Sequence, residues 1–286
     1  MSPQSPSFLV RRRGTLVVLA VCAALAVGAG LLLSAVHSPV SPARSAPKAV
    51  PPTPDMTFDY QIGGGYPPAA GVRAVARDRG DQPAEGMYNV CYVNAFQAQP
   101  DALDWWRENH PDLLLRDDDG DLVVDEAWDE ALLDTTTADR RTRLESIVGR
   151  WIDGCAEAGF QAVEPDNLDS FERSDGLLTP AHNAAFAELL ATRAHAAGLA
   201  IGQKNTTGLL ARREQIGFDF AVTEECGRYD ECGDYASAYD DRVFVVEYTA
   251  RDFAQACASV GARLSVVRRD LDVRPAGEPG YVFRTC

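Results

Sequence analysis

FQAVEPDNLD, at residues 160–169, joins a short apolar strand to polar residues that include three carboxylates. Ala162 and Val163 can be buried in a sheet, whereas Glu164, Asp166 and Asp169 come where the strand ends. A carboxylate costs several kcal/mol to bury without partners, so these acids are expected at a functional site rather than in a core. Acids at the carboxyl end of a buried strand are typical of the mouth of a parallel α/β barrel, where active sites lie.

The rest of the chain alternates short apolar strands with helical segments, which predicts βα units and a parallel sheet. The clearest helix spans residues 138–158 and ends at Gly159, and a second begins at Thr179 and Pro180. The link between the first two strands is too short for a full helix. The expected strands are residues 58–62, 72–77, 88–96, 160–165, 199–204, 218–224, 243–248 and 263–267. They predict a (β/α)8 TIM barrel, with an open doubly wound sheet as the alternative.

The amino-terminal region has the pattern of an export segment. Three arginines at residues 11–13 precede an uncharged stretch at residues 14–36, which is long enough to cross a hydrocarbon core of about 30 Å. We expect residues 1–13 to be a cytoplasmic basic segment and residues 14–36 a transmembrane anchor, with a cleaved signal sequence as the alternative. Residues 37–54, rich in Pro, Ser and Ala, are expected to be a flexible linker to a barrel domain at residues 55–286. The domain is therefore expected outside the cell, anchored to the membrane or secreted.

Charge and cysteine content agree with export. Residues 51–286 contain 22 Lys or Arg and 42 Asp or Glu, a formal charge of −20, which disfavours nucleic acid as a partner. One of the seven cysteines lies in the apolar segment, and the remaining six form an even set, as in disulfide-bonded exported proteins. Six cysteines allow fifteen pairings. We expect Cys226–Cys232, and with it Cys257–Cys286 and Cys91–Cys155.

No metal site is predicted. The cysteine spacings are irregular and include no paired CxxC motif, which disfavours zinc. The acidic stretch DDDGDLVVDE at residues 117–126 is similar to a calcium loop, but the first ligand position falls on Leu115, which cannot coordinate a cation. A turn with acidic flanks is the expected structure.

Polar residues end four consecutive predicted strands, and parallel strands would bring them to one rim. They are Glu164, Asp166 and Asn167, then Lys204 and Asn205, then Glu224 and Glu225, and then Glu247 and Tyr248, with Asn94 near the end of the preceding strand. Two carboxylates from different strands suit glycosidic bond cleavage, in which one protonates the leaving oxygen and the other acts as nucleophile or base. This pattern alone does not choose between Glu164 and Asp166, or between Glu224 and Glu225.

At these strand ends the sequence resembles glycoside hydrolase family 114, the endo-α-1,4-polygalactosaminidase-like proteins, which are (β/α) barrels. The matching stretches are YQIGG (60–64), CYVNAF (91–96), LLD (132–134), GFQAVEPDNLDSF (159–171), GLLT (176–179), AHAAGLAIGQKN (194–205), FDFAVTEECGRYDEC (218–232) and VFVVEY (243–248). The resemblance implies cleavage of α-1,4-linked galactosamine or N-acetylgalactosamine polymers without a cofactor.

The resemblance also implies roles for individual residues. Asp166 and Glu224 fall at the family's acid positions and would form the catalytic pair. The residues expected to line the substrate cleft are Glu164, Asn167, Asp169, Lys204, Asn205, Glu247 and Tyr248, with Asn94 and Asp134 near its edge. The chain departs from the family at Asn94-Ala95-Phe96 and at Arg77-Asp78, so its substrate could differ.

Two other functions remain open at this point. A non-catalytic cell-envelope protein could use the same cleft to bind polysaccharide, and an exported hydrolase could act on a different glycan. Aromatic residues near the rim would serve any of these by stacking on sugars: Tyr66, Phe96, Tyr229 and Tyr248. The acidic domain favours a cationic, partly deacetylated amino-sugar polymer.

Overall fold

A computed structural model describes residues 48–286. The predicted basic segment, the predicted anchor and most of the predicted linker lie outside these residues. Within the described part of the linker, residues 48–54 form no helix or strand, and the Tyr88 hydroxyl donates a hydrogen bond to the Val50 carbonyl at 2.8 Å. Over residues 48–286, no helix has both the length and the apolar character needed to cross a membrane.

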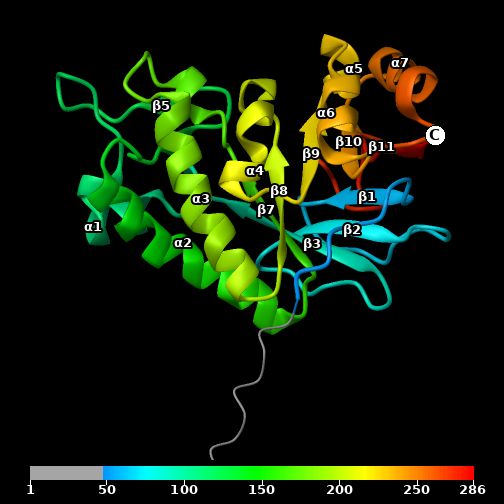
Figure 1. Ribbon diagram of the computed structural model, residues 1–286, viewed down its shortest axis with the longest axis horizontal. Coiled ribbons are helices and arrows are strands. Elements are labelled where there is room, and N and C mark those ends of the chain that lie inside the picture. Colours follow the sequence, from blue (N-terminus) through cyan, green and yellow to red (C-terminus); the bar gives the residue numbers. More distant parts are fainter. Residues whose placement is uncertain (1–47) are drawn as a thin grey trace, which may run out of the picture. The chain divides into compact units, whose positions relative to one another are not determined.

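Eight parallel strands form the centre of the domain, in the predicted order (Figure 1). They are β1 (Phe58–Gln61), β2 (Ala74–Asp78), β3 (Tyr88–Asn94), β7 (Ala162–Asp166), β8 (Ala200–Lys204), β9 (Phe220–Glu224), β10 (Val243–Glu247) and β11 (Ser265–Arg269). The short carboxyl-terminal strand β12 (Phe283–Thr285) pairs antiparallel with β11. The strands therefore form an α/β barrel-like fold, and the open doubly wound alternative is wrong because each strand lies beside its neighbour in sequence order.

The barrel is nearly closed, and contacts that involve side chains, rather than a continuous backbone ladder, join β1 to β10 and β11. The Met56 amide donates to the Ser265 hydroxyl at 2.9 Å. The fully buried side chains of Asp59 on β1 and Arg269 on β11 form an ion pair at 3.3 Å. Phe58 stacks on Phe244 of β10 with ring centroids 4.3 Å apart. These contacts hold β1 against the far side of the sheet.

Alternation along the strands separates two buried clusters. The interior cluster fills the barrel and contains Phe58, Tyr60, Ala74, Ala76, Val90, Ala162, Ala200, Phe220, Val222, Phe244, Val246, Val267 and Val273. The outer cluster lies between the strands and the helices and includes Val163, Ile201, Ala221, Val243 and Val245. This alternation decides which side chains at a strand end face the barrel mouth.

Helices cover the strands only after β3. The connections from β1 to β2 and from β2 to β3 contain no helix, as the short first link predicts. The remaining helices are α1 (Leu103–Asn109), α2 (Ala138–Ala158), α3 (Pro180–Ala196), α4 (Arg213–Ile216), α5 (Cys226–Tyr229), α6 (Cys232–Tyr239) and α7 (Ala250–Val260), with 3₁₀ turns at Pro111–Leu113, Ser170–Arg173 and Thr207–Arg212. A small antiparallel sheet, of order β4 (Gln97–Ala98), β6 (Glu130–Leu132) and β5 (Val124–Asp125), is inserted between β3 and α2.

Local sequence explains the two long helices. Thr137 caps α2 by accepting a hydrogen bond from the Arg140 amide, and Gly159 ends it with φ of 99°, a conformation that suits glycine. Thr179 caps α3, whose first residue is Pro180. The predicted helix at residues 138–158 and the predicted start at Thr179 are therefore confirmed.

Three disulfides fasten the domain, with the expected pairings. Cys91–Cys155 joins β3 to α2, Cys226–Cys232 closes the loop that contains α5, and Cys257–Cys286 attaches the carboxyl terminus to α7. The disulfide prediction is confirmed.

Candidate active site

The carboxyl ends of the barrel strands border one cavity of about 750 Å³. Seven of the predicted site residues line it: Asp166, Asn167, Asp169, Lys204, Asn205, Glu224 and Tyr248. The same cavity is also lined by residues that sequence reasoning missed, among them Tyr92, Asp125, Trp128, Glu130 and Arg173. This volume is within the range typical of small-molecule sites.

Strand alternation accounts for the convergence of the central groups. Lys204 has the same parity on β8 as Ala200, which belongs to the interior cluster, so its side chain faces the barrel. Asp166 on β7 and Glu224 on β9 face inward by the same rule. Three neighbouring strands thus present one cation and two acids to a common point.

The Lys204 ammonium lies among three carboxylates. Its Nζ is 2.9 Å from Glu164 Oε1, 3.0 Å from Asp166 Oδ1 and 3.2 Å from Glu224 Oε2. Because the Asp166 and Glu224 oxygens lie on one nitrogen, at 3.0 Å and 3.2 Å, they are at most 6.2 Å apart. Burial alone would lower the pKa of Lys204, but the surrounding carboxylates raise it well above its ordinary value, so the side chain stays charged.

Asp166 is held in its ionised form. Tyr92 donates its hydroxyl to Oδ2 at 2.6 Å, and the Asn167 amide donates to Oδ1 at 2.7 Å. Burial would raise the pKa of Asp166, but the charge of Lys204 and the hydrogen bonds from Tyr92 and Lys204 outweigh it and lower the pKa below its ordinary value. A charged, hydrogen-bonded carboxylate that reaches an open cavity has the properties of a nucleophile.

Glu164 lies beneath this group and does not line the cavity. Its side chain is fully buried, and its Oε1 accepts hydrogen bonds from Tyr60 at 2.7 Å and from Lys204. Its Oε2 has no hydrogen-bond partner within residues 48–286. Burial raises the pKa of Glu164. Glu164 therefore holds Lys204 in place but does not reach the cavity, whereas Asp166 does. This difference separates the two acids, which the strand-end pattern alone did not.

Glu224 is the more accessible acid of the central group, with 25% of its side chain exposed. Tyr248 donates its hydroxyl to Glu224 Oε1, and Asn205 Oδ1 accepts a hydrogen bond from the Glu224 amide at 2.8 Å. These contacts orient the carboxylate towards the cavity. The neighbouring Glu225, also on the cavity wall, has a left-handed backbone with φ of 58° and pairs with Arg228.

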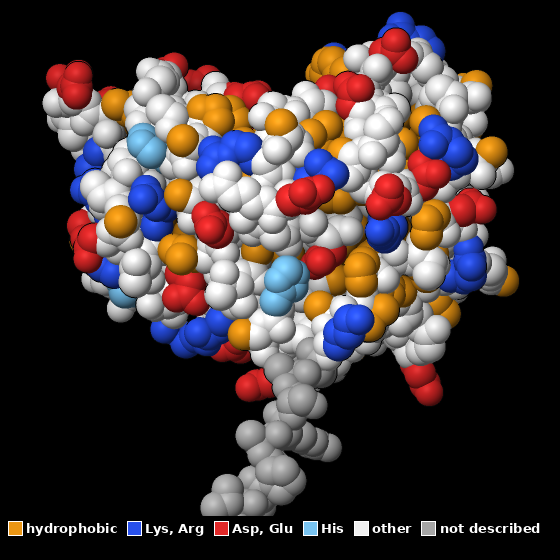
Figure 2. Space-filling model, viewed as in Figure 1, with side chains coloured by type: hydrophobic (Ala, Val, Ile, Leu, Met, Phe, Trp, Pro, Cys, Tyr) orange, Lys and Arg blue, Asp and Glu red, His pale blue; other side chains and the backbone are white. Residues whose placement is uncertain are grey.

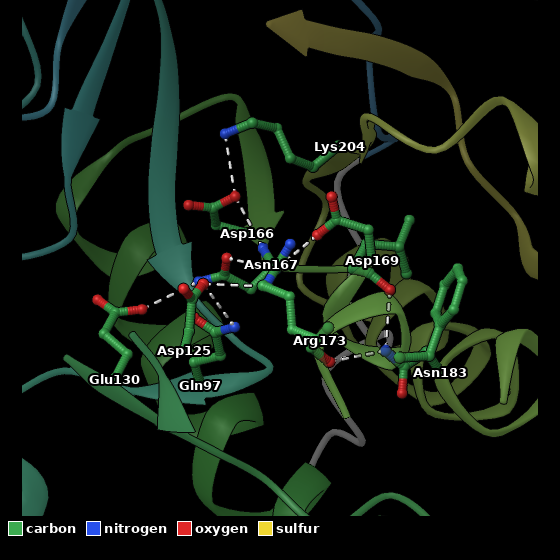
Figure 3. Close-up of polar contacts among 12 residues, drawn as sticks. Gln97, Asp125, Glu130, Asp166, Asn167, Asp169, Arg173, Asn183 and Lys204 are labelled. Atoms are coloured by element: carbon green, nitrogen blue, oxygen red, sulfur yellow. Dashed lines mark hydrogen bonds and ion pairs between the residues drawn. The ribbon is translucent and has the colours of Figure 1, made fainter. Parts of the chain in front are cut away.

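A polar network continues from Asp166 to the inserted sheet (Figure 3). The Asn167 side chain donates to Asn94 Oδ1 at 3.0 Å and to Glu130 Oε2 at 3.2 Å. Asn94 also donates to Glu130 at 2.8 Å, so it holds the wall without lining the cavity. Burial raises the pKa of Glu130 to about 7. Glu130 is thus a cavity carboxyl that titrates near neutral pH.

Arg173 completes this wall. Its guanidinium pairs with Asp125 at 2.9 Å and with Asp169 at 2.8 Å, and it donates to Asn167 Oδ1 at 3.1 Å. Arg173 lies between the two carboxylates (Figure 3). It therefore compensates the charge of the predicted residue Asp169, which is on its own loop, and that of Asp125 in the inserted sheet.

Besides Glu164 and Asn94, two more predicted cleft residues do not line the cavity, Glu247 and Asp134. Glu247 has the parity of Val243 and Val245, which belong to the outer cluster, so its carboxylate lies behind the wall and accepts from the Gly227 amide at 2.6 Å. Burial raises the pKa of Glu247 to about 7. Asp134 lies beside the start of α2, where it pairs with Arg140 at 3.0 Å. We therefore do not propose either as a sugar ligand.

Of the positions at which the chain departs from the family, some line the cavity and others do not. Asp78 lines the cavity, whereas Arg77 lies behind it and donates to Gln61 Oε1 at 3.0 Å. Phe96 is fully buried in the outer cluster. Of the four aromatic residues expected at the rim, Tyr229 and Tyr248 line the cavity, and Tyr66 and Phe96 do not.

Across residues 48–286, one group of His, Cys, Asp or Glu side chains has metal-site spacing, namely Cys226, Cys232 and Glu247. Its two sulfurs are joined in a disulfide, so they offer no thiolate to a metal.

Comparisons with known proteins identify a family and support the fold. The model of glycoside hydrolase family GH114 matches residues 39–286. The chain is similar to the crystal structure of Aspergillus fumigatus Ega3 in complex with galactosamine, with a TM-score of 0.66 and 23% identity over 84% of this chain and 98% of that one. It is also similar to the glycoside hydrolase domain of PelA from Pseudomonas aeruginosa, with a TM-score of 0.53 and 15% identity over 79% of this chain and 98% of that one. No curated protein sequence matches.

Proposed function

Because the chain belongs to glycoside hydrolase family GH114, we propose that it cleaves α-1,4-linked galactosamine or N-acetylgalactosamine polymers with Asp166 and Glu224 as its catalytic pair. The observation that carries this proposal is the meeting of both acids on the Lys204 ammonium, at 3.0 Å and 3.2 Å, beside an open cavity. Two carboxylates on either side of a scissile bond are what glycoside hydrolysis requires.

The spacing of the acids supports a retaining mechanism. Carboxyl groups are about 5–5.5 Å apart in retaining enzymes and about 6.5–9.5 Å apart in inverting enzymes. The Asp166 and Glu224 oxygens that share Lys204 are at most 6.2 Å apart, the sum of their 3.0 Å and 3.2 Å distances, so this pair of oxygens lies below the inverting range. We therefore assign Asp166 as nucleophile and Glu224 as acid and base.

In the first step an Asp166 oxygen attacks the anomeric carbon, the glycosidic bond breaks, and Glu224 gives its proton to the leaving oxygen. In the second step Glu224 takes a proton from a water whose oxygen attacks the same carbon and releases Asp166. The lowered pKa of Asp166, caused by Lys204 and Tyr92 against the effect of burial, keeps the nucleophile ionised at the start.

Charge supports a cationic substrate. The cavity is lined by ten Asp or Glu residues and by two cations, Lys204 and Arg173, both of which already pair with carboxylates. A field of this sign attracts ammonium groups such as those of deacetylated amino sugars. The structural relative Ega3 binds galactosamine in its crystal.

We also propose that the domain acts outside the cytoplasm, anchored by residues 14–36 or secreted after cleavage there. Three disulfides among the described residues support this, because such bonds persist in oxidising compartments.

The test is a substrate panel with the purified domain. Polygalactosamine, its N-acetylated form and an unrelated neutral glucan are incubated with the protein, and new reducing ends are measured at low and high salt. The proposal expects cleavage of the galactosamine polymers, fastest on the deacetylated polymer at low salt. Polymer binding without product would instead indicate a non-catalytic carbohydrate-binding protein, and turnover independent of acetylation and salt would reject the charge argument.

A further inference from the structure

Large exposed apolar side chains gather at the cavity. Over residues 48–286 five such residues are exposed, namely Val50, Trp105, Trp128, Tyr229 and Leu271, and the last three line the cavity. Single exposed apolar residues are ordinary on protein surfaces, but a concentration of them at one polar cavity marks a binding surface. Trp128 and Tyr229 are 54% and 61% exposed, so their rings are available to a ligand.

The two aromatic residues stand on different sides of the catalytic acids. Trp128 lies between β5 and β6 of the inserted sheet, which follows β3, whereas Tyr229 ends α5, which follows β9. β7 and β8 separate β3 from β9 in the barrel, so the two aromatic residues follow strands that are three strand spacings, roughly 14 Å, apart along the sheet. Figure 1 places β5 and α5 at opposite upper sides of the domain, and Figure 2 shows the surface dipping between them.

Both walls are held in place before any ligand binds. The Trp128 amide donates to the Asp125 carbonyl at 3.2 Å, and Asp125 itself is paired with Arg173. Tyr229 lies in the loop closed by the Cys226–Cys232 disulfide, and the Arg228 guanidinium lies 5.2 Å from its ring centroid. A binding surface whose backbone is already ordered loses less conformational freedom when it binds a ligand, so more of the contact energy appears as affinity.

We propose that Trp128 and Tyr229 are outer sugar-binding platforms, one on each side of the Asp166–Glu224 pair, for successive rings of one amino-sugar chain. This deepens the proposed function and rests on it. Each ring presents an apolar C–H face to an aromatic side chain, while its ammonium group faces the surrounding carboxylates. The platforms would hold a long chain across the acids, so that cleavage occurs within the chain and depends on its length.

The experiment compares Trp128→Ala and Tyr229→Ala with Trp105→Ala, an exposed tryptophan that does not line the cavity. For each, kcat/KM is measured on polygalactosamine and on a short oligosaccharide of the same sugar. The ratio of the long-chain to the short-chain value is expected to fall roughly fivefold to tenfold in the first two variants and to stay at the wild-type level in Trp105→Ala. An unchanged ratio in Trp128→Ala and Tyr229→Ala, or an equal fall in Trp105→Ala, would overturn the proposal.

A second measurement separates failure of the platforms from failure of the proposed function. Binding of the same polymer is measured by calorimetry in an Asp166→Asn background, with and without each aromatic substitution. If the wild-type chain releases no product but polymer affinity still depends on Trp128 and Tyr229, the catalytic proposal fails and the platforms stand. If polymer binds with equal affinity to all variants, the platforms fail. If polymer does not bind at all, both fail.

Discussion

Replacing Lys204 by Met removes the central charge while keeping a long hydrocarbon side chain. Lys204 is buried and pairs with Glu164, Asp166 and Glu224 at 2.9 Å, 3.0 Å and 3.2 Å. Removing one partner of a buried ion pair costs about 3–5 kcal/mol, because the remaining charges lose their compensation. We expect a loss of that size in the free energy of unfolding at neutral pH, measured by urea denaturation.

The same variant should change the pH profile of activity. The nearby charge of Lys204 lowers the pKa of Asp166, so without Lys204 the pKa of Asp166 should rise. The acid limb of kcat/KM, which reports ionisation of the nucleophile in the free enzyme, should therefore move to higher pH. Rate measurements between about pH 3 and pH 8 give both limbs.

The stability change has a definite sign with pH. In the wild type the lowered pKa of Asp166 contributes stability that is present above its unfolded-state pKa and is lost as pH falls through the folded-state value. In Lys204→Met the uncompensated carboxylates are costly at neutral pH and take up protons as pH falls, so the deficit relative to wild type should shrink in acid. Arg193→Met, which removes an ion pair with Asp153 outside the cavity, is the control and should leave the acid limb in place. A folded Lys204→Met with an unmoved acid limb would refute the reasoning.

Two further predictions concern stability. Burial raises the pKa of Glu130 to about 7, so the wild type should lose stability as pH rises from about 5 to 8. In Glu130→Gln the free energy of unfolding, measured by urea denaturation, should change less with pH over this range. Parallel pH profiles for the wild type and the variant would contradict the assignment. Replacing the two cysteines of one disulfide by serine should lower the free energy of unfolding by about 2 kcal/mol for Cys226–Cys232 and by about 4 kcal/mol for Cys91–Cys155. The larger loss is expected for Cys91–Cys155 because it closes the longer loop, with a sequence separation of 64 residues against 6. Activity should nonetheless fall more on loss of Cys226–Cys232, which lies beside the cavity, and equal activity losses would count against that role.

Much of the fold could be predicted because the barrel strands are short and apolar. The position of polar residues at the carboxyl ends of the predicted strands also identified Asp166, Lys204 and Glu224 as site residues. Counting from the strand end does not reveal which side of the sheet a residue faces. Glu247 ends its strand as Glu224 does, yet it faces the outer cluster, since its parity matches that of Val245. Applying the two-residue period to β10 would have separated these two glutamates.

Other site residues carried weaker signals. Tyr60 and Tyr92 read as apolar strand residues, but their hydroxyls bind Glu164 and Asp166 at the barrel mouth. Both have inward parity, and the alternation rule could have found them. Glu130 and Trp128 lie in a small antiparallel insertion whose strands are only two or three residues long, so no periodic pattern could locate them.

The most direct test of the central claim is the rate of reducing-end release from polygalactosamine by Asp166→Asn and Glu224→Gln. Both substitutions preserve side-chain shape and remove an ionisable oxygen. We predict that each lowers kcat by roughly a thousandfold or more while circular dichroism shows an intact fold. Wild-type turnover in either folded variant would contradict the assignment of these two acids.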